Sequence, residues 1–184
     1  TGLWQYDRAP ANGASFVCHG LRLLLVSDDP DKYGRIVEYQ KKVITALGIM
    51  NGPSHGEVKW FKEEPVLVEV GARCHGGDGL WVNIAEESVG VSQVQSTVDV
   101  YLSPPEVFDS MPAVQTTRQA FAGQKWLVSY QEGILNQINP AAVTEIKAMS
   151  SYRGHQFFVK AGKQIKKTRN CFTWVGCVNL CNTD

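Results

Sequence analysis

The 184-residue sequence predicts an α+β fold, and three features of the chain carry that prediction. Short apolar runs of strand length are bounded by turn residues such as Pro10, Asn12 and Gly13. Residues 31–47 have the spacing of apolar residues that is typical of an amphipathic helix. From Thr117 onward, strand-sized runs recur and glycines separate them.

The first part of the chain predicts strands followed by the helix. We expect strands at residues 4–6 and 15–18, around the Asn-Gly turn, and a further strand at residues 21–26. Gly48 suits the C-terminal cap of the helix. The helix face that we expect to be shared is formed by Tyr33, Ile36, Val37, Gln40, Ile44 and Leu47.

The middle of the chain predicts a strand pair and then helices. The apolar runs at residues 56–61 and 65–71 indicate neighbouring strands, with turn residues between them. Residues 85–91 are ambiguous, whereas residues 92–102 favour a helix with Val94, Val98 and Tyr101 facing inward. Prolines end this helix. A short helix or turn at 105–111 follows, and then strands at 125–130, 133–138, 143–149, 157–161 and 170–180.

Two carboxylates are the most informative feature of the strand pair. Glu57 and Glu69 each lie within an apolar run, where an acid is costly to bury unless a cation or a hydrogen-bond donor compensates it. Arg73 follows, and then a loop that contains Gly76 and Gly77. Such a set favours a site for a hard metal ion that carries phosphate oxygens.

A purely structural interpretation of the same residues stays open. Glu69 could pair with Arg73 as a structural ion bridge, and Glu57 could be a solvated strand residue opposite Lys59. The two acids together, ahead of an arginine and several glycines, favour the metal and phosphate site over this alternative.

The same segment resembles a known family. Residues 52–57 read GPSHGE, a hairpin follows, and residues 69–77 read EVGARCHGG. This arrangement is similar to the metal-binding end of ATP-grasp carboxylate–amine ligases, whose pattern is approximately G-P-x-H-x-E, a hairpin, and E-x-N/G-x-R-x-G-G. Residues 3–24 resemble the strand pair that precedes this end. Residues 132–143, 159–168 and 176–180 resemble the small β-rich lobe that closes such ligases.

For the fold, the resemblance implies the C-terminal lobe of an ATP-grasp domain. We expect a mostly antiparallel sheet with flanking helices, plus a β-rich C-terminal extension. The expected domains are residues 1–110, which carry the metal and phosphate site, and residues 111–184, which form the small β-rich lobe.

For the chemistry, the resemblance implies an ATP-dependent ligase that forms an amide or peptide bond through an acyl phosphate. It implies that Glu57 and Glu69 hold Mg²⁺ or Mn²⁺, with ATP as co-substrate. Arg73 would have a catalytic role at the transferring phosphoryl or acyl oxygen. The expected phosphate- or substrate-binding residues are Gly76, Gly77 and Asp78.

The roles of three positions in this segment stay open or differ from the family pattern. His55 is either a catalytic residue that orients the Glu57 loop or touches substrate, or a hydrogen-bonded turn residue. Asp78 either helps to bind a substrate amine or serves the turn. Gly71 stands where many relatives carry asparagine as a ligand to a second metal, so that such a metal must use water or bind weakly.

The resemblance also implies partners. In ATP-grasp ligases the lobe with the phosphate-contacting lysine and glycine-rich loop precedes this region, so we expect either that missing N-terminal lobe or other protein subunits. If complete, the protein would bind ATP and small carboxylate and amine substrates. The alternative is a non-catalytic domain derived from such a ligase, which serves as a structural or interaction subunit of a larger assembly.

The composition excludes some other classes. Eighteen basic and eighteen acidic side chains cancel, so we expect no broad field for nucleic acid or for a membrane surface. No run approaches the roughly 18 apolar residues that cross a bilayer. The five cysteines lack the spacing of a paired C-x-x-C zinc site. We expect reduced thiols in an intracellular protein, cytoplasmic or organellar, rather than a disulfide between Cys171 and Cys177.

Overall fold

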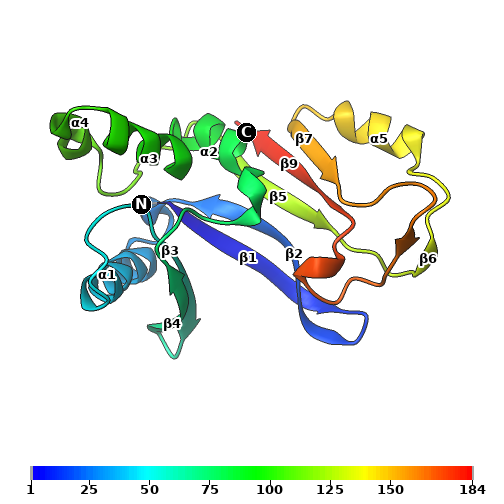
Figure 1. The fold of residues 1–184 in the computed structure, drawn as a ribbon, viewed down its shortest axis with the longest axis horizontal. Coiled ribbons are helices and arrows are strands. Elements are labelled where there is room, and N and C mark those ends of the chain that lie inside the picture. Colours follow the sequence, from blue (N-terminus) through cyan, green and yellow to red (C-terminus); the bar gives the residue numbers. More distant parts are fainter. Residues whose placement is uncertain (1, 184) are drawn as a thin grey trace. The chain divides into compact units, whose positions relative to one another are not determined.

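The computed structural model describes residues 2–183, which form two compact units (Figure 1). The first unit contains residues up to Leu3 and Leu24–Arg118, and the second contains Trp4–Leu23 and Gln119–Asp184. The second unit is therefore discontinuous in sequence. The predicted domains 1–110 and 111–184 stay a prediction, and the compact units differ from them in where Trp4–Leu23 belongs.

A five-stranded sheet forms the second unit. The strand order is β1-β2-β5-β9-β7, and the β2–β5, β5–β9 and β7–β9 pairs are antiparallel, so the predicted fold class is confirmed. Beside it lie a two-stranded sheet, β6–β8, a short 3-10 turn, η3, and one helix, α5. The bounds are β1 Leu3–Ala11, β2 Ala14–Leu24, β5 Phe121–Leu127, β6 Gly133–Ile134, α5 Pro140–Lys147, β7 Tyr152–Phe157, β8 Gln164–Ile165, η3 Cys171–Thr173 and β9 Gly176–Asn182.

Local sequence explains the N-terminal hairpin of this sheet. Asn12 and Gly13 have φ angles of 52° and 80°, as the predicted Asn-Gly turn requires. The Asn12 amide also donates hydrogen bonds to the carbonyl oxygens of Ser129 and Thr168, at 2.9 and 2.8 Å, which ties the turn to its own unit. The two strands predicted at residues 15–18 and 21–26 form one continuous strand, β2.

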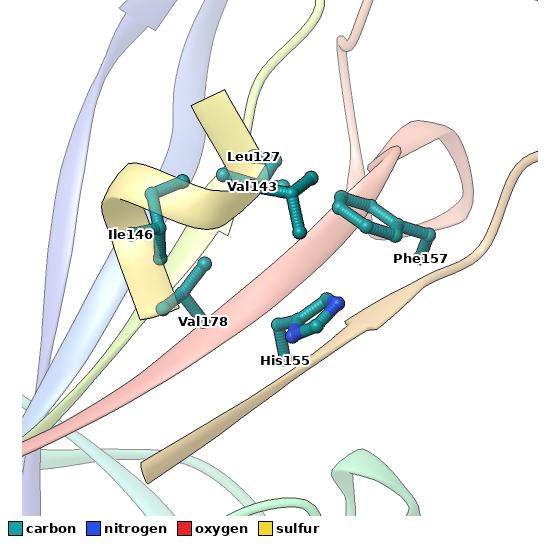
Figure 2. Close-up of a pocket in the computed structure, with 6 residues that line it drawn as sticks. All are labelled: Leu127, Val143, Ile146, His155, Phe157 and Val178. Atoms are coloured by element: carbon teal, nitrogen blue, oxygen red, sulfur yellow. The ribbon is translucent and has the colours of Figure 1, made fainter. Parts of the chain in front are cut away.

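The prediction of a strand at residues 143–149 is wrong, because helix α5 occupies most of this segment. The Asn139 side chain accepts hydrogen bonds from the backbone N–H groups of Ala141 and Ala142, and Pro140 begins the helix. Val143 and Ile146 then fall on one helical face, where they line a small hollow with Leu127, His155, Phe157 and Val178 (Figure 2).

The C-terminal strand prediction needs two smaller corrections. The strand predicted at residues 157–161 lies earlier, as β7, and the one predicted at 170–180 divides into η3 and β9. Cys171 lies in η3 and is exposed, so it does not sit in a strand facing Cys177. All five cysteines are free thiols, as expected.

The first unit consists of one hairpin and a series of helices. The hairpin is a separate two-stranded sheet, β3–β4. Its bounds and those of the helices and 3-10 turns are η1 Val26–Asp28, α1 Pro30–Ala46, β3 His55–Phe61, β4 Glu64–Gly71, η2 Gly77–Gly79, α2 Val82–Val89, α3 Gln93–Leu102 and α4 Pro105–Ser110.

The ends of α1 follow from the capping residues. The Asp29 side chain accepts a hydrogen bond from the Lys32 backbone N–H, and Pro30 begins the helix. At the other end Gly48 has a φ of 68°, so the predicted glycine cap is confirmed. Val37 is buried on the predicted face, whereas Leu47 is exposed because the helix has already ended at Ala46.

The predicted inward face of α3 is wrong. The helix itself is confirmed, and the Ser92 side chain caps it by accepting from the Gln95 backbone N–H. However, Val94, Val98 and Tyr101 are 40%, 44% and 65% exposed. The residues of α3 that do face its own unit are the polar Gln93 and Thr97, which contact the loop after β4. Within residues 2–183, none of the helices combines the length and apolar character that crossing a bilayer needs.

Candidate metal and phosphate site

The register of the β3–β4 hairpin brings the two predicted carboxylates together. Glu57 and Glu69 are direct partners across the strands, and so are His55 and Gly71. Directly opposed residues project to the same face of a sheet, and alternate residues of a strand share that face. Glu57 and Glu69 therefore share one face, with His55 beside them, and we call this the carboxylate face.

Helix α1 covers the opposite face of the hairpin. Gly56 points to that side, and its missing side chain leaves room for the end of the Gln40 side chain. One residue of α1 earlier, the Tyr39 hydroxyl accepts a hydrogen bond from the Leu67 backbone N–H at 3.2 Å, next to the β-bulge of the hairpin. Helix α1 therefore does not cover the carboxylate face.

The two acids differ in their burial. Glu57 is half-buried, whereas Glu69 is exposed, as are Val66 and Val68 of the same strand. The apolar run that surrounds Glu69 is thus not a buried strand, because a two-stranded sheet with one covered face has little interior. The expected burial cost for Glu69 does not arise, and its place opposite Glu57 is the feature that matters.

Arg73 lies close to His55 and bends back over the end of β4. Its guanidinium contacts the His55 ring nitrogen Nδ1 at 3.4 Å and donates a hydrogen bond to the Cys74 carbonyl oxygen at 2.9 Å. In the part of the chain that the structure describes, Arg73 forms no ion pair with Glu69. The alternative of a structural Glu69–Arg73 bridge is therefore not what holds Arg73 in place.

Three aromatic rings lie in a row beside Arg73, each tilted against the next. The His55 and His75 rings have centroids 4.7 Å apart, and His75 and Trp81 have centroids 5.1 Å apart. Burial lowers the pKa of His75 to about 4, and the neighbouring His55 and Arg73 add to that effect. Burial likewise lowers the pKa of His55, and Arg73 does so too, while Glu57 and Glu69 act in the opposite direction. Both imidazoles are therefore mostly neutral at pH 7.

The glycine loop ends in a sharp left-handed turn. Gly77, Asp78 and Gly79 have φ angles of 72°, 52° and 71°, so the two glycines are needed for the backbone path. Asp78 is exposed and sits inside this turn, which matches its turn interpretation without excluding a substrate contact. The Trp81 indole N–H donates to the Gly76 carbonyl oxygen at 2.8 Å and fixes the start of the loop.

Gln93 is a site residue that the sequence analysis missed. Its side-chain oxygen accepts a hydrogen bond from the His75 backbone N–H at 2.7 Å, and its amide donates to the Ser54 carbonyl oxygen at 2.9 Å. One side chain of α3 thus joins the residue before His55 to the glycine loop. Only the position of Gln93 at a helix start could have drawn attention to it, because glutamine has no chemistry that marks a site.

The donor set fits a magnesium ion that brings its own ligands. Within residues 2–183, no group of three or more His, Cys, Asp and Glu side chains is arranged to hold a metal ion. Magnesium, however, is commonly bound through one or two carboxylates, with water and substrate phosphates completing its shell. Two carboxylates on one face of the hairpin, with a guanidinium nearby, supply that kind of partial site.

Comparisons with known proteins agree on the fold. No family model matches the chain. Dapdiamide A synthase from Enterobacter agglomerans is 35% identical over 104 residues, which are 56% of this chain and 23% of that protein. An L-amino acid ligase from Bacillus licheniformis superposes with a TM-score of 0.75 at 22% identity, over 96% of this chain and 42% of that one. Phosphoribosylglycinamide synthetase from Anaerococcus prevotii gives 0.68 at 16% identity, over 98% and 44%.

These similarities confirm the predicted resemblance to ATP-grasp carboxylate–amine ligases. The chain spans about a quarter of the length of the curated relative and less than half of the structural ones.

Proposed function

We propose that this chain is the metal- and phosphate-binding portion of an ATP-dependent ligase that joins a carboxylate to an amine. The observation that carries the proposal is the direct pairing of Glu57 with Glu69 on the carboxylate face of the hairpin. The fold similarity to ligases and the sequence similarity to a synthase supply the reaction class. The activity of a whole ligase would require the nucleotide-binding lobe as well.

The chemistry of this proposal proceeds in two balanced steps. A substrate carboxylate oxygen attacks the γ-phosphorus of ATP, the bond to the β-γ bridging oxygen breaks, and an acyl phosphate and ADP form. An amine then attacks the acyl carbon, and phosphate leaves as the amide bond forms and the amine loses a proton. A bound Mg²⁺ would neutralise charge on the phosphates.

The residues of this chain would position the substrates and neutralise charge, and would not themselves form covalent bonds to them. Glu57 and Glu69 would bind the cation. Arg73 would present its planar guanidinium to a phosphoryl or acyl oxygen. His55, neutral at pH 7, would accept or donate a hydrogen bond at its free ring nitrogen. Gly76 and Gly77 would leave room for an anion to approach the backbone.

A binding experiment tests the cation role directly. A preformed complex of Mn²⁺ with tripolyphosphate is titrated into the protein in a calorimeter, since this probe has the phosphates of ATP without the adenine. We expect binding to the unmodified chain, and a loss of at least about tenfold in affinity for Glu57→Gln and for Glu69→Gln. Glu63→Gln is the matched control, because Glu63 lies in the turn of the same hairpin, at the end away from the site.

Two results would contradict the proposal. One is an unmodified protein that does not bind the probe, which would favour the alternative of a non-catalytic interaction subunit. The other is equal binding by the Glu57, Glu69 and Glu63 variants, which would show that the carboxylate pair takes no part.

A further inference from the structure

Gly71 occupies a special place on the carboxylate face. It is the last residue of β4, it pairs with His55, and it is two residues from Glu69, so a side chain at position 71 would project to the same face as the two acids. The backbone does not require glycine there, because the φ angle of Gly71 lies outside the left-handed region. The explanation for glycine must therefore come from the space around it.

The Arg73 side chain fills that space. A Cβ atom built on Gly71 would lie 3.4 Å from Arg73 Cγ, 3.5 Å from Nε and 3.8 Å from Cζ. These are ordinary contact distances for a single methyl group, so alanine fits. We expect a longer side chain such as leucine to extend towards the guanidinium and to displace it.

The far end of Arg73 is fixed by two further contacts, namely the Cys74 carbonyl oxygen and the His55 ring. The guanidinium thus lies across the end of β4 on the carboxylate face, held between position 71 and His55.

We propose that Gly71 is a positioning residue, whose lack of a side chain seats Arg73 beside Glu57 and Glu69. This inference rests on the proposed function, because the seat matters for chemistry only if the acids hold a cation and phosphate. It adds that a fixed arginine charge, rather than a side chain at position 71, completes the site.

Two variants at position 71 distinguish a loss of Arg73 positioning from a general loss of structure. Gly71→Leu places a side chain in the path of the guanidinium, whereas Gly71→Ala adds only the methyl group that the space accepts. The first readout is the ¹H–¹⁵N heteronuclear NOE of the Arg73 Nε–H group, which reports its mobility. We expect a high NOE in the unmodified protein and in Gly71→Ala, and a clear drop in Gly71→Leu. Gly34→Ala, at a helix site with nothing within 4 Å of the added atom, controls for glycine replacement.

The second readout is affinity for the manganese–tripolyphosphate complex. We expect Gly71→Leu to weaken binding by about tenfold, as the loss of a charge-assisted contact implies. In an Arg73→Ala background the same replacement should have no further effect.

The outcomes keep the two proposals apart. If Arg73 is equally ordered in Gly71→Leu, or if the replacement still weakens binding without Arg73, the positioning role is overturned. It is also overturned if Arg73 becomes mobile and binding does not change. A third outcome is that Gly71→Leu makes Arg73 mobile while the unmodified chain binds no complex. Gly71 then does position Arg73, but the proposed function is wrong, and with it the role of Arg73 in that function.

Discussion

At the scale of single residues, His75 is the side chain of the site that is most affected by its surroundings. Its ring lies between His55 and Trp81, and its pKa is lowered to about 4. An unfolded chain would protonate the same histidine near pH 6.5. Between these two values the unfolded state binds the proton more tightly, so acid favours unfolding.

The first prediction concerns stability against pH. The contribution of His75 is complete above about pH 6.5 and is lost as the pH falls towards 4, by about 2 kcal/mol after allowance for solvent screening. Urea unfolding at pH 7.5, 6.0 and 5.0 measures this loss. His75→Phe keeps an aromatic ring between His55 and Trp81 but cannot titrate, so the stability of this variant should fall less steeply with pH. A smaller slope should remain because the pKa of His55 is also lowered. Equal slopes for the two proteins would contradict the prediction.

Two glutamines provide a matched pair for the second prediction. The Gln40 amide nitrogen and oxygen are buried without hydrogen-bond partners, whereas the buried Gln124 donates to Asn179 Oδ1 at 2.8 Å. Because an unpartnered buried amide costs free energy, Gln40→Leu should stabilise the protein by about 1 kcal/mol. Gln124→Leu should destabilise it by about 1–3 kcal/mol, because it removes the donor to a buried acceptor. Chemical denaturation measures the free energy of unfolding of both variants. If both variants change it in the same direction, the prediction is wrong.

The acids of the site could be predicted from the sequence, but their geometry could not. Glu57 and Glu69 stood out because carboxylates are rare inside apolar runs. Their direct pairing depends on a β-bulge after Glu57, and a shift of one residue would have sent one of them to the α1 face. Nor does the sequence show that Arg73 bends back over Gly71, because that contact is decided by local space.

At the scale of elements, α3 holds the glycine loop in place. Gln93 bridges Ser54 and His75, and the Thr97 hydroxyl lies 3.6 Å from the Cys74 sulfur. The loop after β4 thus depends on a helix that follows it in the sequence. Such a dependence gives the loop a fixed shape without any regular structure of its own.

The third prediction is that Gln93→Leu loosens this loop. The variant keeps the size of the side chain but loses both hydrogen bonds, which should cost about 1–3 kcal/mol. Amide hydrogen exchange should become faster at His75 than in the unmodified protein. Gln95→Leu is the control, since Gln95 lies on the same helix and bonds only within it, to Asp99. Unchanged protection of the His75 amide would show that Gln93 does not hold the loop.

Helices were predicted well where capping and periodicity agreed, as in α1. The helix α5 was missed because Val143 and Ile146 suggested a strand, although Asn139 and Pro140 are strong signals of a helix start. For α3 the apolar residues were assigned to the interior by their spacing. Spacing identifies a face but not what covers it, and in α3 the polar side chains make the contacts.

At the scale of the whole molecule, the protein has highly exposed apolar side chains and no net charge. The formal net charge is zero at pH 7, and Met50 and Leu102 are 81% and 82% exposed. Proteins without net charge associate more readily, because no repulsion keeps the copies apart.

The fourth prediction is therefore that the protein self-associates near pH 7. Light scattering should show larger particles at pH 7, close to the isoelectric point of about 6.8, than at pH 8.5, where the chain carries a net negative charge. Met50→Lys should reduce the association more than Asn51→Lys, which adds the same charge at a neighbouring exposed position but removes no apolar surface. Equal effects of the two variants would assign the change to charge alone.

The discontinuous second unit has a consequence for how the protein is made. Strand β2 hydrogen-bonds to β5, and about a hundred residues of chain separate the two. During translation, the hairpin of β1 and β2 leaves the ribosome long before its sheet neighbour exists, while the segment from Leu24 to Arg118 can already fold. Until β5 is synthesised, β2 presents an unpaired edge to other nascent chains. Messages that stall near the codon for Arg118 should therefore yield insoluble products, and chaperones that shield strand edges should be needed most in that interval.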